Sequence, residues 1–187
     1  MGVDSSRLFE QVERNMKLPR VIGFSGLAGS GKTTVAQAFA DAHGYTRVSF
    51  AEPLKKMLAV LVPADAAKTD ERPELCGKTV RFALQSLGTE WGRKMIGDTI
   101  WIDAMLHRLQ AGECFVIDDV RFENEAQALQ NQGATIIRVH RDGVGVMDHE
   151  SERGIPDHLV NIEVSNSGSL KQTMDNVEIA LRQWPKG

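Results

Sequence analysis

The most constraining feature of the sequence is a glycine-rich segment near the N-terminus, GLAGSGKT at residues 26–33. It matches G-x-x-x-x-G-K-[ST] without a gap, between an apolar run that predicts a strand over about residues 20–25 and an amphipathic run that predicts a helix through His43. The glycines let consecutive backbone N–H groups surround an anion, and the N-terminus of the helix adds its unpaired N–H groups and the positive end of its dipole. The segment therefore predicts a phosphate-binding loop.

Two side chains of this loop have a specific chemistry. Lys32 is expected to reach the β- and γ-phosphates of a nucleotide, and Thr33 to ligate Mg²⁺ through its hydroxyl. An ordinary strand-to-helix turn is the alternative, but it would not require a lysine and a threonine in register with the glycines. The predicted phosphate-binding residues are Ala28, Gly29, Ser30, Gly31, Lys32, Thr33 and Thr34.

Composition predicts one globular domain in a reducing compartment. The length of 187 residues suits a single domain. A net charge of −3 and a pI near 6.0 argue against a surface devoted to nucleic acid or to anionic membrane. Cys76 and Cys114 show no metal-ligand spacing and no disulfide framework, and Cys114 is expected in the core at the start of a strand. Without a long apolar run or a signal peptide, the protein is expected to be soluble and cytoplasmic.

Strand-like and helix-like runs alternate along the chain after the loop. Residues 1–17 are expected to form a helical extension, and residues 18–187 the main domain. Alternation of this kind predicts an α/β fold with three layers, a parallel sheet with helices on both faces. Residues 63–78 are expected to form a long loop, and residues 142–157 a polar connection. Strands are predicted over about 45–50, 114–120, 134–141 and 159–166, and helices over 51–62, 79–95, 98–110, 121–132 and 170–184.

A second group of candidate residues lies at the end of the strand-like run CFVIDDV. Asp118 and Asp119 are expected at its carboxyl end, the edge where open α/β sheets bind their ligands. A carboxylate there can hold Mg²⁺ through water, and Arg121 can pair with phosphate oxygens as a planar fork. The structural alternative is that Asp119 caps the next helix and that Arg121 pairs with Glu125, one turn further on.

The predicted helix over residues 79–95 has two unlike faces. Two glycines in a helix cost about 1 kcal/mol each relative to alanine, which indicates that something approaches closely. A ligand that contacts Arg81 and Gln85 would explain them, and a solvated face with tightly packed neighbours is the alternative. Glu90 is expected to form a surface ion pair with Arg93 or Lys94. The apolar stripe is Val80, Leu84, Leu87, Trp91 and Met95, and the opposite face is Arg81, Gln85, Gly88 with Thr89, and Gly92.

The motifs together resemble those of the deoxynucleoside monophosphate kinases of tailed bacteriophages, a branch of the P-loop nucleotide kinases. The phosphate-binding loop specifies only the superfamily, whereas the LQ-LGTE and DVRF-NEA patterns are more discriminating. The family usually has a neutral residue where Asp118 stands, so the metal or acid role is assigned first to Asp119. The resemblance covers about residues 18–183 and rests, in order, on GLAGSGKTT, LQSLGTEWGRKMIGDTIW, DDVRFENEA, RVHRDG and HESE.

The resemblance implies that the γ-phosphoryl group of ATP passes to the 5′-phosphate of a deoxynucleoside monophosphate (dNMP), with Mg²⁺ held by Thr33 and, through water, by Asp119. It implies a helical acceptor-binding region over about 52–110 and a lid over about 141–157, which closes and excludes water. His149 and Ser151 belong to the lid, whereas Arg138 could lie on either face of the sheet. The expected catalytic residues are Lys32, Arg121, Asp119 and Arg141. The expected acceptor-binding residues are Arg81, Gln85, Thr89, Glu90, Asp98, Trp101, Arg121 and Glu152.

The acceptor base and the alternatives stay open at this point. The resemblance allows dGMP, dTMP, dCMP or modified dCMP, with Trp101 as a candidate for stacking and Trp91 more suited to the core. A homodimer is expected, and neither a nucleic acid polymer nor a membrane is expected as a partner. A P-loop kinase of another metabolite, such as dephospho-coenzyme A, would leave LQSLGTEW unexplained. A nucleotide-dependent switch or packaging motor disagrees with the small size and the lack of a basic stripe.

Overall fold

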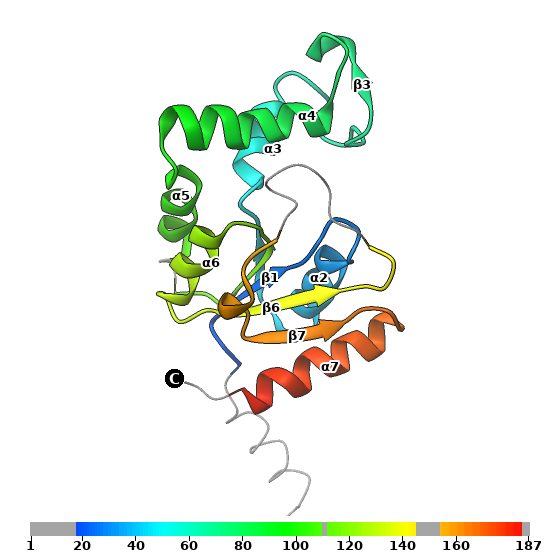
Figure 1. Cartoon of the computed structure of the whole chain (residues 1–187), viewed down its shortest axis with the longest axis vertical. Helices are drawn as coiled ribbons and strands as arrows, with labels where there is room; N and C mark the ends of the chain where they lie inside the picture. Colours follow the sequence, from blue (N-terminus) through cyan, green and yellow to red (C-terminus); the bar gives the residue numbers. More distant parts are fainter. Residues whose placement is uncertain (1–17, 110–111, 145–153, 185–187) are drawn as a thin grey trace, which may run out of the picture.

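A five-stranded parallel sheet organises the protein in a computed structural model that describes residues 18–109, 112–144 and 154–184 (Figure 1). The strand order is β2-β5-β1-β6-β7. Every residue of β1 and β5 is buried, as expected of central parallel strands with both faces covered. The predicted α/β fold is therefore confirmed. The strands are β1 Val21–Ser25, β2 Thr46–Val48, β5 Phe115–Val120, β6 Thr135–His140 and β7 Ile162–Ser165.

Helices cover both faces of the sheet and form the two outer layers. On one face, α2 (Lys32–His43) and α7 (Leu170–Gln183) pack with Val116 and Ile137 of the sheet. On the other face, α3 (Glu52–Leu58), α5 (Ile100–Arg108) and α6 (Glu123–Gln130) share a core with Ile117. No helix within the described ranges is both long enough and apolar enough to cross a membrane.

Strand β5 is displaced by one residue from the prediction at its start. Cys114, expected in the core, precedes the strand and is exposed, although its carbonyl accepts a hydrogen bond from the N–H of Thr46 at 2.8 Å. At the other end the strand extends through Val120. Asp118 and Asp119 therefore lie within the strand, directly before its last residue, and both are buried. The prediction for Cys114 was wrong because backbone pairing at a strand entrance does not require a buried side chain.

Residues 63–78, expected as an irregular loop, contain a small antiparallel hairpin. Strands β3 (Glu71–Arg72) and β4 (Lys78–Thr79) pair around a 3₁₀ turn over Pro73–Leu75. The chain reverses through Cys76 and Gly77, whose φ angles are 53° and 75°. Strands of two residues are too short to show a period of two in the sequence, so this element was missed.

The predicted helix over 79–95 forms, but its winding changes along its length. It begins as α4 (Val80–Gln85) and continues as a π-helix over Ser86–Ile96. The wider turn rotates the following side chains relative to an α-helix. Met95, expected in the apolar stripe, is 75% exposed, whereas Arg93, expected on the surface, is 7% exposed.

Close contacts with Trp101 and Leu54 explain the glycines of this helix. Its indole Nε1 donates a hydrogen bond to the carbonyl of Gly88 at 2.8 Å, and a Cβ placed on Gly92 would lie 2.5 Å from Trp101 Cζ2. A Cβ on Gly88 would meet Leu54 at 3.1 Å. The close approach inferred from the glycines is real, but at Gly92 the approaching group is a side chain of this chain and not a ligand.

The Gly92→Ala substitution is expected to destabilise the protein. Alanine favours a helix over glycine by about 1 kcal/mol, but the added methyl must displace a packed indole, and overpacking typically costs about 1–3 kcal/mol. Urea unfolding should therefore show a lower free energy of unfolding. Gly97→Ala is the matched control, because Gly97 is extended and has nothing within 4 Å of its Cβ position. Equal stability of Gly92→Ala and the unsubstituted protein would contradict the packing argument.

Candidate active site

The phosphate-binding loop joins the carboxyl end of β1 to the N-terminus of α2. Gly29 and Gly31 have φ angles of 88° and 84°, which side chains rarely adopt. A Cβ on Gly31 would also lie 2.2 Å from Nδ2 of Asn166, and that nitrogen donates to the carbonyl of Ser30 at 2.9 Å. Thr173 of α7 donates in turn to Oδ1 of Asn166 at 3.0 Å. The loop is thus held by an asparagine at the end of β7, a residue that sequence reasoning missed.

Lys32 begins α2 and lies across the loop. Its Nζ donates to the carbonyl of Leu27 at 3.2 Å, and the residue is 7% exposed. The hydroxyls of Ser25 and Ser30 are buried without a hydrogen-bond partner among the described residues. Curved backbone, a lysine ammonium and hydroxyls without a protein partner fit the phosphates of a nucleotide.

A cavity of about 340 Å³ opens beside the loop. Its wall brings together the loop, the start of α3, the helix over 80–96 and the end of β5. Basic side chains outnumber acidic ones, with Lys32, Lys55, Lys68, Arg81, Arg93 and Arg121 against Asp118, Asp119 and Glu125. Such a wall attracts anions. The sequence-predicted residues that line it are Ala28, Gly29, Lys32, Thr33, Arg81, Gln85, Thr89, Trp101, Asp119 and Arg121.

Two of the predicted acceptor residues point elsewhere. Glu90 pairs with Lys94 at 2.9 Å on the exposed side of the π-helix, as the surface alternative expected. Asp98 is 73% exposed along its side chain and accepts a hydrogen bond from Asn124 at 2.8 Å. Neither residue lines the cavity. Glu152, His149 and Ser151 lie outside the described residues.

Arg141 lies at a second cavity, of about 330 Å³, on the other side of the phosphate-binding loop. Its Nε donates to the carbonyl of Asn166 at 3.2 Å. Arg138 also lines this cavity, but it is bound to Asp157 at 2.5 Å and to Glu163 at 2.8 Å. Ile155, within the range expected for the lid, is buried in the core, so the end of that range is anchored.

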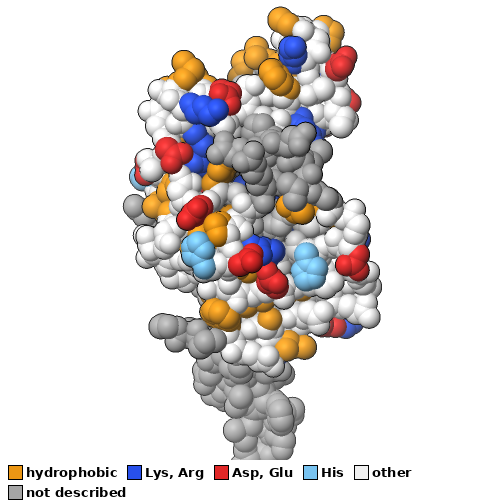
Figure 2. Space-filling model, in the orientation of Figure 1, with side chains coloured by type: hydrophobic (Ala, Val, Ile, Leu, Met, Phe, Trp, Pro, Cys, Tyr) orange, Lys and Arg blue, Asp and Glu red, His pale blue; other side chains and the backbone are white. Residues whose placement is uncertain are grey.

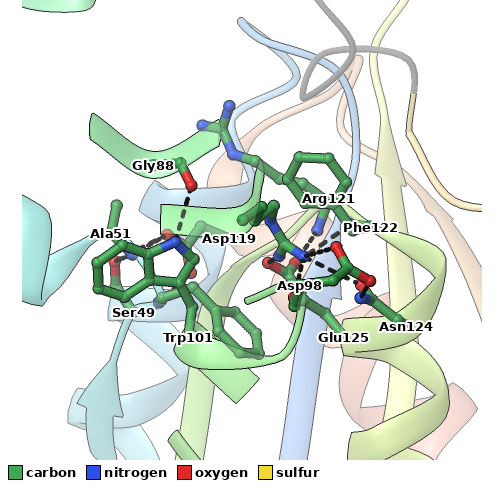
Figure 3. Close-up of polar contacts among 12 residues, drawn as sticks. Ser49, Ala51, Gly88, Asp98, Trp101, Asp119, Arg121, Phe122, Asn124 and Glu125 are labelled. Carbon is green, nitrogen blue, oxygen red and sulfur yellow. Dashed lines mark hydrogen bonds and ion pairs between the residues drawn. The ribbon is translucent and has the colours of Figure 1, made fainter. Parts of the chain in front are cut away.

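Asp119 holds the turn between β2 and α3. Its Oδ1 accepts the N–H of Phe50 at 2.8 Å, and its Oδ2 accepts the hydroxyl of Ser49 at 2.8 Å and the N–H of Ala51 at 3.0 Å (Figure 3). Asp119 does not cap α6, because its oxygens are bound by these three donors, and the N–H groups of Arg121 and Phe122 just before α6 are accepted by Glu125. Neither reading of Asp119 from the sequence anticipated these donors.

Asp118 points to the opposite face of the sheet, the face that α2 covers. It accepts a hydrogen bond from Arg47 Nη1 at 2.5 Å, and Arg47 pairs in register with Val116 of the same face. Burial raises the pKa of the Asp118 carboxyl, and the neighbouring Asp119 adds to this, whereas Arg47 opposes it. Asp118 also lines the cavity, together with Thr33 at the start of α2.

A buried ion pair closes the far wall of the cavity. Arg93 of the π-helix contacts Oε1 of Glu125 at 2.5 Å and donates to the carbonyl of Asp98 at 3.0 Å. The other oxygen of Glu125 accepts the N–H groups of Arg121 at 2.9 Å and Phe122 at 3.2 Å (Figure 3). Burial raises the pKa of Glu125 to about 7, against the opposing effects of those N–H groups and of Arg93. Arg93, expected on the surface from the sequence, is therefore buried, and its pair with Glu125 was not anticipated.

Comparison with solved structures agrees with this architecture. Shikimate kinase from Aquifex aeolicus superposes with a TM-score of 0.53 at 12% identity, over 86% of this chain and 95% of that one. A gluconokinase from Sinorhizobium meliloti gives 0.50 at 15% identity, over 88% and 93%. At these identities the likeness shows the fold, that of small P-loop kinases.

Sequence comparisons identify the family. The family described as "Deoxynucleotide monophosphate kinase" matches residues 75–177. The "Putative deoxynucleotide monophosphate kinase" of Acanthamoeba polyphaga mimivirus is 35% identical over 156 residues, which are 71% of this chain and 80% of that protein. The "Deoxynucleotide monophosphate kinase" of Enterobacteria phage T4 is 27% identical over 110 residues, 56% of this chain and 46% of the phage protein, so the match spans less than half of that relative. With its phosphate-binding loop and basic cavity on a P-loop kinase fold, the chain belongs to the deoxynucleotide monophosphate kinase family.

Proposed function

We propose that this chain transfers the γ-phosphoryl group of ATP to the 5′-phosphate of a deoxynucleoside monophosphate in the cavity beside its phosphate-binding loop. One observation carries the proposal: Lys32 of the loop, Arg81 of α4 and Arg121 after β5 line a single cavity. Two anionic substrates repel each other, so the transfer needs positive groups from separate segments that hold both in line. Apart from this positioning and neutralisation of charge, the reaction requires little covalent chemistry from the protein.

The donor and the acceptor would occupy different parts of the site. ATP phosphates fit the loop, where Lys32 would neutralise the charge on the β- and γ-phosphates. The acceptor phosphate fits Arg121, with Arg81 nearby in the wall, and its nucleoside fits the region of Gln85 and Thr89. Arg141, from the cavity on the other side of the loop, would reach the transferring group from there.

The residues at the cavity fit Mg²⁺ bound together with ATP. When bound, the ion neutralises charge on the β- and γ-phosphate oxygens. Within the described residues no three His, Cys, Asp or Glu side chains are grouped to hold a metal, which suits an ion held largely by phosphates and water. Thr33 and Asp118 would supply the protein side of that site. We assign the carboxylate to Asp118 because three donors already occupy the oxygens of Asp119.

The domain limits and the acceptor identity are part of the proposal. Residues 18–187 would form the kinase domain, with residues 52–110 as its acceptor region, and a homodimer remains the expected assembly. The candidate acceptors are dGMP, dTMP, dCMP and modified dCMP. A panel of deoxynucleoside and ribonucleoside monophosphates, with dephospho-coenzyme A as a competing acceptor, assayed for ADP release from ATP, tests this choice. Turnover with dephospho-coenzyme A, but with none of the nucleoside monophosphates, would contradict the proposal.

Lys32→Ala should lower kcat by about 100-fold or more, the usual cost of removing a group that stabilises charge in the transition state. The measurement is steady-state ADP release with dNMP and ATP, combined with thermal unfolding to check the fold. Lys56→Ala, which removes an exposed lysine of α3, should retain normal kcat. A folded Lys32→Ala protein with normal turnover would rule out phosphoryl transfer at this loop.

Arg121→Lys should lower kcat/KM for the dNMP by about 10- to 100-fold, because a lysine keeps the charge but loses the planar two-point grip on phosphate. The KM for ATP should change little. Arg182→Lys, at an exposed position of α7, is the matched control for the same chemical change. Unaltered kinetics in Arg121→Lys would remove this arginine from the acceptor site.

Asp118→Asn and Asp119→Asn should separate the metal role from the structural one. Asp119→Asn places an NH₂ group against N–H donors, so the free energy of unfolding in urea should fall by about 1–3 kcal/mol. Asp118→Asn should instead raise the Mg²⁺ concentration needed for half-maximal activity, with a smaller change in stability because its partner Arg47 is 36% exposed along its side chain. The reverse pattern would return the metal role to Asp119.

A further inference from the structure

Phe122 lines the acceptor side of the cavity next to Arg121. It is the residue that precedes α6, its backbone is extended with a φ of −111°, and Glu125 accepts its N–H at 3.2 Å. Phe122 is half-buried, and the next residue, Glu123, is exposed. A large apolar side chain thus stands beside the arginine that we assign to the acceptor phosphate.

The ring of Phe122 packs against the buried guanidinium of Arg93. The guanidinium carbon of Arg93 lies 3.9 Å from the centre of the ring, within the range of a cation–π contact. Arg93 itself is 7% exposed and is fixed by Glu125 at 2.5 Å and by the carbonyl of Asp98 at 3.0 Å. The ring and the guanidinium behind it both belong to the cavity wall.

Trp101, the candidate for base stacking from the sequence, is less suited to that role. It is 7% exposed, its N–H is bound to the carbonyl of Gly88, and its six-membered ring fills the space at Gly92. The surface of Trp101 is therefore largely buried against the π-helix. Phe122 is the aromatic side chain of the cavity wall that keeps more of its surface accessible.

We propose that Phe122 is the platform on which the base of the acceptor nucleotide stacks, with Arg93 as the positioning residue behind it. The inference rests on the proposed function and names the part of the site that takes the base. Arg121 and Phe122 are consecutive, so phosphate and base would be held from one rigid turn. The cation–π contact with the guanidinium holds the ring of Phe122 in place. Because every base has such a face, this contact supplies affinity without choosing the base.

Phe122→Leu tests the platform. Loss of the stacked ring should weaken dNMP binding and lower kcat/KM for the dNMP by about 5- to 100-fold. The factor should be similar for each dNMP that the protein accepts. The KM for ATP should stay within about 2-fold. Phe122→Tyr keeps an aromatic ring and should retain most of the affinity. Phe82→Leu is the matched control, because Phe82 is 52% exposed on α4 and does not line the cavity.

A baseless ligand distinguishes stacking from a distorted site. The dissociation constant of 2-deoxyribose 5-phosphate, measured by calorimetry or by displacement of a dNMP, should be the same in Phe122→Leu and in the unsubstituted protein. An equal loss for dNMP and for the baseless ligand, or no loss for dNMP, would overturn the platform. If the unsubstituted protein bound dNMP but did not phosphorylate it, the proposed reaction would fail, whereas the binding comparison would still decide the role of Phe122.

Discussion

The arrangement of the site depends on one buried carboxylate, that of Glu125. A carboxylate removed from water is costly unless charged or polar donors surround it. Here the donors come from two segments, the Arg93 guanidinium of the π-helix and the N–H groups of Arg121 and Phe122 after β5. Because both segments donate to the same buried carboxyl group, moving either one away would leave a buried polar group without its donor, and this holds the two segments together at the wall of the cavity.

The part of the fold that the sequence predicted depends on local patterns. The phosphate-binding loop has its own register of glycines, lysine and threonine, and the alternation of strands with helices was sufficient to predict the parallel sheet. The π-helix was not predictable in this way, because Val80, Leu84, Leu87 and Trp91 fit an ordinary α-helix equally well. It packs against Trp101, which donates a hydrogen bond to a carbonyl 13 residues earlier in the chain. A contact of that kind leaves no periodic trace in the helix itself.

The same distinction applies to the candidate site. Lys32 and Arg121 could be named from motifs and do line one cavity, but the partners that orient the site lie far away in sequence. Asp119 is bound by residues 68 to 70 positions earlier, and Arg93 by Glu125 32 positions later. A carboxylate in a motif shows only that negative charge is present. Whether it faces a metal or fastens a turn depends on which face of the strand it occupies and on which donors reach that face.

On the face of the molecule that Figure 2 shows, Lys and Arg side chains are interspersed with Asp and Glu over both the helical end and the sheet. At the opposite end of the chain, Asn166 has a consequence for the order of assembly. It follows β7, is held by Thr173 of α7, and binds the carbonyl of Ser30 within the phosphate-binding loop 136 residues earlier. During synthesis the loop leaves the ribosome long before the asparagine that shapes it. A chain whose last strand and helix have not yet docked therefore lacks the hydrogen bond to Ser30 that supports the phosphate-binding loop.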